Sequence, residues 1–131
     1  MTKVFIDGSA GTTGLRIYER LEKRKDIELL KLSKEKRKDK NARKEALNSA
    51  DIAFLCLPDD AARESVSLCE NESTVIIDTS TAHRTAENFA YGFPELSAGY
   101  KAKISVSKRI AVPGCHASGF ISLIYPLIEN G

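Results

Sequence analysis

No apolar run in this sequence approaches the ~18 residues that a helix needs to span a bilayer. The N-terminal residues enter a short strand-like run directly. They show neither the longer apolar stretch nor the small-residue cleavage site of a secretory signal. We therefore expect a cytoplasmic protein with no membrane partner.

Paired cysteines and an excess of one charge are also lacking. The three cysteines, Cys56, Cys69 and Cys115, form neither a CxxC nor a CxxH pattern, which argues against a disulfide framework and a zinc site. The 20 basic and 18 acidic residues leave a net charge of +2, too near neutral to indicate a nucleic-acid partner. We expect no bound metal, and a small molecule as the partner.

Five short runs are apolar nearly throughout instead of alternating, as strands covered on both faces are. Segments with helical spacing separate them, after Gly14, at residues 41–47 and after Pro58. This alternation indicates βαβ units. We predict one doubly wound α/β domain over residues 1–131, with a parallel sheet and helices on both faces. The five runs are residues 3–7, 27–33, 52–58, 74–80 and 109–113.

The last helical segment, residues 117–128, is apolar almost all round. A helix of this kind must be buried against something. Pro126 should kink or end it, because proline has no amide hydrogen to donate. One sheet face is too little cover for such a helix, so we expect a partner surface outside this chain.

The first predicted strand leads into a GxxGxxG turn formed by Gly8, Gly11 and Gly14, and a helix follows. Glycines permit a tight turn and let the backbone approach a pyrophosphate, while the helix N-terminus presents free amides. We predict a dinucleotide site here. Its other contacts would be Ala10 within the turn and the hydroxyls of Thr12 and Thr13.

The end of the second predicted strand indicates which dinucleotide binds. An NAD site usually has Asp or Glu there, bonded to the ribose 2′-hydroxyl. This strand ends at Ser33 and Lys34, with Arg37 close behind, so cations are available for a 2′-phosphate. We predict NADP(H). The alternative is that the basic stretch 34–44 is a solvated helix and loop.

Cys115 follows Pro113-Gly114 and opens the last helix. The positive end of a helix dipole favours a thiolate, which is a good nucleophile for an acyl group. We predict that Cys115 is the nucleophile and that the amides of Ala117 and Ser118 stabilise an oxyanion. Cys56, placed inside a strand, and Cys69, placed on an apolar helix face, fit the commoner role of buried structural cysteines.

Several polar residues lie near this cysteine in the predicted fold. His116 is adjacent, but neighbours at a helix start point in different directions, so we do not favour it as a base. Ser80, His83 and Arg84 follow the fourth strand at the same sheet edge. We expect Ser80 at the cofactor and His83 and Arg84 at the substrate, with Arg84 suited to an anionic group. The alternative is a loop whose polar groups bond one another.

Four ordered motifs, GSAGTTGL (residues 8–15), DTSTAHR (78–84), YGFPEL (91–96) and PGCHASG (113–119), resemble N-acetyl-gamma-glutamyl-phosphate reductase of the shorter, second type. The resemblance implies that NADPH reduces N-acetylglutamyl 5-phosphate to the semialdehyde in arginine biosynthesis. Cys115 would match the family's nucleophile, which forms a thioester and releases phosphate.

The resemblance also implies that something is missing. Family members are more than twice this long, and their second domain carries the catalytic histidine, much of the substrate site and the main subunit contacts. We therefore expect these residues to be the dinucleotide-binding portion alone, able to bind NADP but with little turnover, and the full-length enzyme to be a homo-oligomer.

Two other interpretations stay open. Aspartate-semialdehyde dehydrogenase has a similar fold and cysteine, but its nucleophile segment usually reads Gly-Cys-Asn, where this chain has His116. An NADP-binding module without catalysis would need no reactive thiol. The rate at which Cys115 reacts with iodoacetamide separates this second case from an enzyme.

Overall fold

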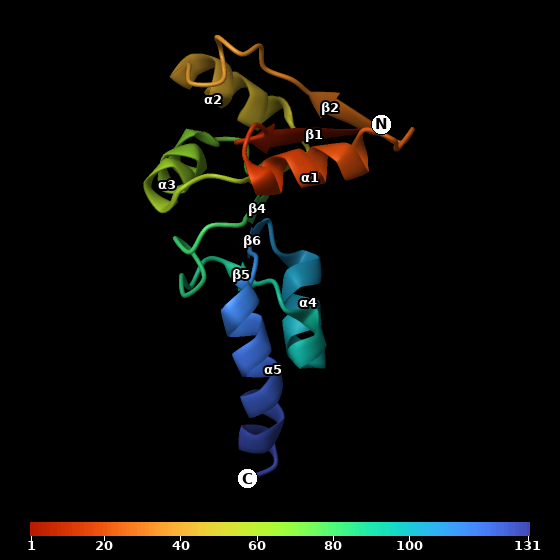
Figure 1. The fold of residues 1–131 in the computed structure, drawn as a ribbon, viewed down its shortest axis with the longest axis vertical. Helices are drawn as coiled ribbons and strands as arrows, with labels where there is room; N and C mark the ends of the chain where they lie inside the picture. Colours follow the sequence, from red (N-terminus) through yellow and green to blue (C-terminus); the bar gives the residue numbers. More distant parts are fainter.

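The computed structural model describes residues 1–131 and contains one six-stranded parallel sheet in the order β2-β1-β3-β4-β6-β5 (Figure 1). This confirms the predicted doubly wound α/β fold. The strands are β1 (Thr2–Asp7), β2 (Ile27–Leu30), β3 (Ile52–Leu55), β4 (Val75–Asp78), β5 (Ala90–Tyr91) and β6 (Arg109–Ala111).

A helix lies between each strand and the next, except between β4 and β5, which a loop joins. The chain moves outward from β1 to β2 and then back past β1 to β3, which puts α1 on one face of the sheet and α2 and α3 together on the other. The helices are α1 (Thr12–Leu21), α2 (Lys40–Ser49), α3 (Asp59–Leu68), the short 3-10 helix η1 (Pro94–Leu96), α4 (Ala98–Val106) and α5 (Cys115–Glu129).

The core lies between the central strands and the α2–α3 layer. Leu47 of α2, Leu55 of β3 and Ile76 of β4 have no exposed surface. Near-continuous apolar strands are what a sheet covered on both faces requires. The core therefore fixes the central strands and, with them, the loops at their carboxyl ends.

The strand order reverses at β1, which pairs with β2 on one side and β3 on the other. The loops after β1 and β3 therefore diverge and leave a crevice at the carboxyl edge of the sheet. Crevices of this kind hold the ligands of open α/β sheets. The glycine turn follows β1 at this place.

The predicted runs are longer than the strands they contain. The second run was expected to continue to Ser33, but β2 ends at Leu30, and Cys56 lies one residue beyond β3 instead of inside it. The structure also adds β5 and α4, which were not expected. No residue of α4 is buried, so the sequence shows no apolar period there, and β5 has only two residues.

Helix α5 does not end at Pro126 but continues to Glu129, and none of its residues is buried in this chain. This agrees with the expectation that the chain alone covers the helix too little, and the partner surface expected for it stays a prediction. Figure 1 shows α5 extending away from the sheet toward the C-terminus. Its most exposed large side chains are Phe120, Leu123, Leu127 and Ile128, at 66 to 73%.

None of the helices is both long enough and apolar enough to cross a bilayer.

Candidate functional site

Gly8 and Gly14 are required by the geometry of the first turn. Gly8 has φ +86°, and a β-carbon there would lie 2.3 Å from the Cys56 carbonyl oxygen. A β-carbon on Gly14 would lie 2.3 Å from the Gly8 carbonyl oxygen. Gly11 is different, because its nearest neighbour would be 3.6 Å away. Two glycines therefore build the turn, while the third leaves open space beside it.

The amides that begin α1 are free. Gly11 is the N-cap and supplies no side-chain bond. The amides of Thr12, Thr13 and Gly14 donate to no protein acceptor, and the first intrahelical bond runs from Leu15 to Gly11. Free amides together with the positive end of the helix dipole suit an anion such as a pyrophosphate.

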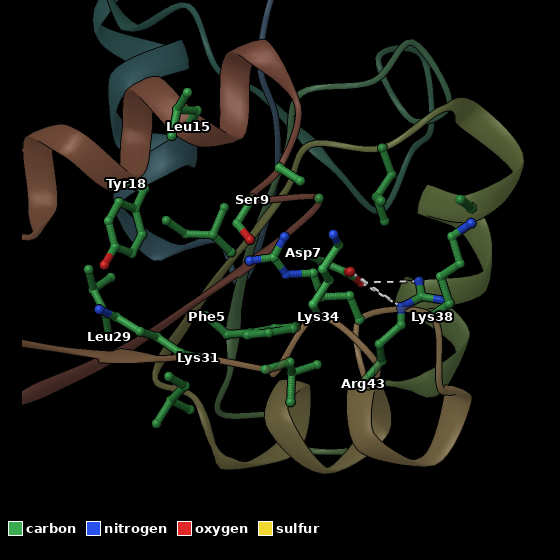
Figure 2. A pocket seen from close by; sticks show the side chains of 18 residues that line it. Phe5, Asp7, Ser9, Leu15, Tyr18, Leu29, Lys31, Lys34, Lys38 and Arg43 are labelled. Carbon is green, nitrogen blue, oxygen red and sulfur yellow. Dashed lines mark hydrogen bonds and ion pairs between the residues drawn. The ribbon is translucent and has the colours of Figure 1, made fainter.

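A cavity of about 720 Å³ opens beside this turn, between β1, β2, α1 and the loop before α2 (Figure 2). It brings Gly8 and Ala10 of the turn together with Lys34 and Arg37 of the loop, as the sequence led us to expect. It is apolar over most of its wall and cationic at one side. The remaining residues that line it are Phe5, Ile6, Asp7, Ser9, Leu15, Tyr18, Leu29, Leu30, Lys31, Leu32, Lys38, Arg43, Leu57 and Ala61.

Ser33 acts from outside the cavity. Its carbonyl oxygen accepts the amides of Lys36 and Arg37 at 3.0 and 3.1 Å, which closes a turn that carries Lys34 and Arg37 to the cavity wall. Thr12 lies by a smaller hollow, together with Ala10 and Gly11. Of the predicted cofactor residues, Gly11, Thr12, Thr13, Gly14 and Ser33 thus surround the cavity without lining it.

A buried ionic cluster at the end of β1 was not expected. The Asp7 carboxylate accepts hydrogen bonds from Nε and Nη2 of Arg43, each at 3.1 Å (Figure 2). It also accepts one from the Ser65 hydroxyl at 2.7 Å. Arg43 also donates to Glu64 at 2.9 Å. Burial alone would lower the pKa of Arg43, but the bonds to Asp7 and Glu64 outweigh it and leave that pKa raised. Both members of the Asp7–Arg43 pair line the cavity.

A second buried carboxylate, Asp78, organises the loop after β4. It accepts the amide of Ser80 and, at 2.9 Å, the Ser80 hydroxyl, and Nδ1 of His83 lies 2.6 Å from it. The His83 ring stacks on Phe89, with centroids 4.3 Å apart. Ser80 is buried and outside the cavity, so its hydroxyl serves this loop instead of facing the cofactor crevice.

Arg84 links this loop to the turn before α5. Its Nε donates to the Val112 carbonyl at 3.0 Å, and Nη2 donates to the Thr79 carbonyl at 3.3 Å. The guanidinium lies against Gly114, where a β-carbon would come within 2.7 Å of Nη1. Many polar groups of this loop thus bond one another, as the alternative interpretation held. Arg84 nevertheless lies beside Gly114, the residue that precedes Cys115.

Cys115 is exposed and is the first residue of α5. Its Sγ lies 3.5 Å from Nδ1 of His116, closer than we expected for adjacent residues. The amides of Cys115, His116 and Ala117 have no protein acceptor, but that of Ser118 donates to the Gly114 carbonyl at 2.8 Å. The expectation that the Ser118 amide is free to bind an oxyanion is therefore wrong. The Ala117 amide is free, so its predicted contact with an oxyanion stays a prediction.

The other two cysteines are sheltered. Cys69 is buried in the core and caps α3. Cys56 is half-buried, and burial raises the pKa of its thiol, with only a partial offset from a hydrogen bond with Thr79. Both fit the structural role that the sequence indicated. No group of three or more His, Cys, Asp and Glu side chains lies close enough together to hold a metal ion.

A doubly wound sheet with a glycine turn, free helix amides and a cation-lined cavity at its strand-order reversal defines a dinucleotide-binding domain. The family described as semialdehyde dehydrogenase, NAD binding domain, matches residues 34–104. The chain belongs to this family. The match begins at Lys34, after the glycine turn, and ends before Cys115.

Individual proteins extend the comparison. N-acetyl-gamma-glutamyl-phosphate reductase of Chelativorans sp. is 57% identical over 129 residues, which cover 98% of this chain and 42% of that protein. Aspartate semialdehyde dehydrogenase from Francisella tularensis has a similar fold, with a TM-score of 0.70 at 18% identity, over 99% of this chain and 41% of that one. The enzyme of the same name from Candida albicans, determined with NADP, has a TM-score of 0.65 at 18% identity, over 99% of this chain and 47% of that one.

The chain thus spans about 40% of the length of the curated relatives that it matches.

Proposed function

We propose that this chain is the NADP-binding and nucleophile-bearing part of an N-acetyl-gamma-glutamyl-phosphate reductase. The observation that carries the proposal is the cavity in which the glycine turn meets Lys34 and Arg37. The 57% identity with a reductase of that name supports the choice of substrate, because it extends over 98% of the chain.

The residues fit NADP at both of its charged parts. The absence of a β-carbon at Gly8 and Gly14, with the free amides of α1, leaves a cradle for the pyrophosphate. Lys34 and Arg37 supply positive charge for the 2′-phosphate, and no carboxylate lies on that loop side of the cavity to repel it. The NADP present in the similarly folded enzyme of Candida albicans agrees with this assignment.

Cys115 would carry the acyl group. Its thiolate attacks the carbonyl carbon of the acyl phosphate, a carbon–sulfur bond forms, and the bond to the phosphate oxygen breaks as phosphate leaves. The amides of His116 and Ala117 would stabilise the negative oxygen of the tetrahedral intermediate. When bound, NADPH would supply a hydride to the thioester carbon, after which the carbon–sulfur bond would break to release the aldehyde and restore the Cys115 thiolate.

Arg84 is the candidate for an anionic group of the substrate. It is held against Gly114 by its bonds to the Val112 and Thr79 carbonyls, while Nη1 makes no hydrogen bond within the protein. A guanidinium with unused donors beside the nucleophile suits a carboxylate or phosphate. His83, fixed by Asp78 and Phe89, would shape the same region.

The remaining assignments follow from this role. A biosynthetic reductase of this kind acts in the cytoplasm on a small acyl phosphate, with neither nucleic acid nor membrane as partner. The longer protein would be a homo-oligomer. These 131 residues alone should bind NADP but oxidise little or no NADPH when given the substrate. Steady NADPH oxidation by this chain would contradict the proposal that the complete active site needs residues outside it.

The test of cofactor binding is calorimetric titration of the chain with NADPH and NADH. We expect tighter binding of NADPH, and changing both Lys34 and Arg37 to Ala should remove the preference by weakening NADPH binding about tenfold or more. Lys36→Ala is the matched control, because Lys36 lies in the same loop but outside the cavity. Equal binding of NADPH and NADH, or an equal loss from Lys36→Ala, would contradict the assignment.

The test of the nucleophile separates an enzyme from a binding module without catalysis. Cys115 in this chain should react with iodoacetamide faster than a free peptide thiol, since it begins a helix and lies beside His116. Cys115→Ser identifies the fast signal. A rate equal to that of the peptide would favour the module.

A further inference from the structure

The Asp7–Arg43 pair places the only carboxylate of the cavity wall next to the proposed pyrophosphate cradle. Asp7 is the last residue of β1, and Gly8 follows it directly. The position of its carboxylate is fixed by Arg43 and Ser65, and Asp7 is only 4% exposed. A negative charge so close to the turn would oppose the binding of a pyrophosphate.

Arg43 offsets that charge from a different element. It comes from α2, is 7% exposed, and uses three of its N–H groups on Asp7 and Ser65 and one on Glu64. Because the pair is shielded from water, its charges act on their surroundings more strongly than exposed ones would. The net field at the cradle therefore depends mainly on the balance of these two buried residues, while Glu64, more exposed and also paired with Lys40, adds a better-screened charge.

We propose that the Asp7–Arg43 pair sets the charge of the cavity at the pyrophosphate, so that Arg43 raises and Asp7 limits the affinity for dinucleotides of either kind. This inference rests on the proposed function, because it assumes a dinucleotide in the cavity. It differs from the role of Lys34 and Arg37, which should act on the 2′-phosphate and hence on NADPH alone.

Three variants test the inference by calorimetric titration with NADPH and NADH at low salt. Arg43→Gln should weaken the binding of both cofactors by roughly tenfold, because it leaves the Asp7 carboxylate beside the cradle without a compensating positive charge. Asp7→Asn should tighten both by roughly threefold, although the loss of an ionic partner lowers stability. The double variant should return both affinities toward those of the unmodified chain.

Ser65→Ala is the control for structure. It removes the hydroxyl that bonds both Asp7 and Arg43, but it changes no charge and lies outside the cavity. It should lower the urea midpoint of unfolding and leave both affinities within about twofold. If one single variant fails to fold, the other single variant compared with the double variant still decides: the inference predicts that the double variant reverses the change in affinity, and no reversal would overturn it.

The outcomes separate the two proposals. If the unmodified chain binds neither cofactor, the proposed function fails. If it binds NADPH but Asp7→Asn and Ser65→Ala weaken binding alike, the pair serves only the architecture of the turn and the inference is overturned. An effect of Arg43→Gln confined to NADPH would also overturn it, because that result would place Arg43 at the 2′-phosphate.

Discussion

The guanidinium of Arg84 occupies the space that a β-carbon on residue 114 would need, at 2.7 Å from Nη1. Gly114 therefore allows a cation from the β4 loop to lie directly before the nucleophile. The backbone of Gly114 is not left-handed, so no unusual angle requires a glycine here. The glycine instead makes room for a contact between two residues that are 30 positions apart in the sequence.

Gly114→Ala should change the reactivity of Cys115 more than the stability of the fold. The clash falls on the far end of the Arg84 side chain, so Arg84 can move away at the cost of its hydrogen bonds to the Val112 and Thr79 carbonyls, without a change in the backbone. Without the neighbouring cation, reaction of Cys115 with iodoacetamide should slow by roughly threefold or more. Gly119→Ala is the comparison, since its β-carbon would meet nothing within 4 Å and, by favouring the helix, it should leave the rate unchanged or make it faster. Equal effects of the two variants would contradict a role for the Arg84 contact.

Gly8 and Gly11 should respond to alanine in opposite ways. Gly8→Ala forces a side chain onto a left-handed backbone and against the Cys56 carbonyl, so we expect a loss of about 2 kcal/mol or more in the free energy of unfolding. Gly11→Ala should lower the free energy of unfolding by less than about 1 kcal/mol. It should nevertheless weaken the binding of NADPH, because its β-carbon enters the open space beside the turn. Urea unfolding and calorimetric titration measure the two effects. Unchanged NADPH binding in Gly11→Ala would place the cofactor away from Gly11.

The three cysteines should alkylate in a defined order. Burial raises the pKa of Cys56, and Cys69 is buried, whereas Cys115 is exposed. At pH 7.5, Cys115 should be labelled at least about tenfold faster than the others. The rate at Cys56 should keep rising through pH 9, as its thiolate forms. Mass spectrometry of the digested chain follows each site, and labelling of Cys56 as fast as Cys115 would contradict its burial.

Asp59 should make the stability sensitive to acid. A hydrogen bond from the Thr81 hydroxyl holds the pKa of this carboxyl below its ordinary value, and the Thr81 amide bonds the other oxygen at 3.0 Å. Because the pKa is lower in the folded state, the stabilisation is present above pH of about 4 and is lost as pH falls through the folded value. Urea midpoints at pH 7, 5 and 3 should fall less for Asp59→Asn than for the unmodified chain. Parallel curves would show that the bond to Thr81 adds nothing.

The sheet was predictable because its signal is local. Each central strand is a short apolar run, and each crossover begins with a recognisable turn, such as the glycines after β1. The same local character made the glycine turn and the Lys34–Arg37 loop identifiable as parts of one site. Their meeting in one cavity follows from the strand order, because β1 and β2 are neighbours.

The ionic pairs were not predictable, because their partners lie far apart in sequence. Asp7 and Arg43 are 36 residues apart, and no spacing pattern joins them. Asp78 stood within a recognised motif, but its burial and its bonds to Ser80 and His83 depend on how the β4 loop folds back. The lack of cover over α5 could be expected from its all-apolar pattern, but that pattern does not show where the covering surface lies.

Helix α5 also links the thiol to a local folding equilibrium. None of its 15 residues is fully buried, and a helix of this length with so little cover is only marginally stable in water. The free amides and the dipole at Cys115 exist only in molecules in which the first turns of α5 are wound. Any apolar surface that covers Phe120 and Leu123 would shift that equilibrium toward the wound helix. Such a surface would thereby increase the fraction of molecules whose nucleophile is ready, without touching Cys115 itself.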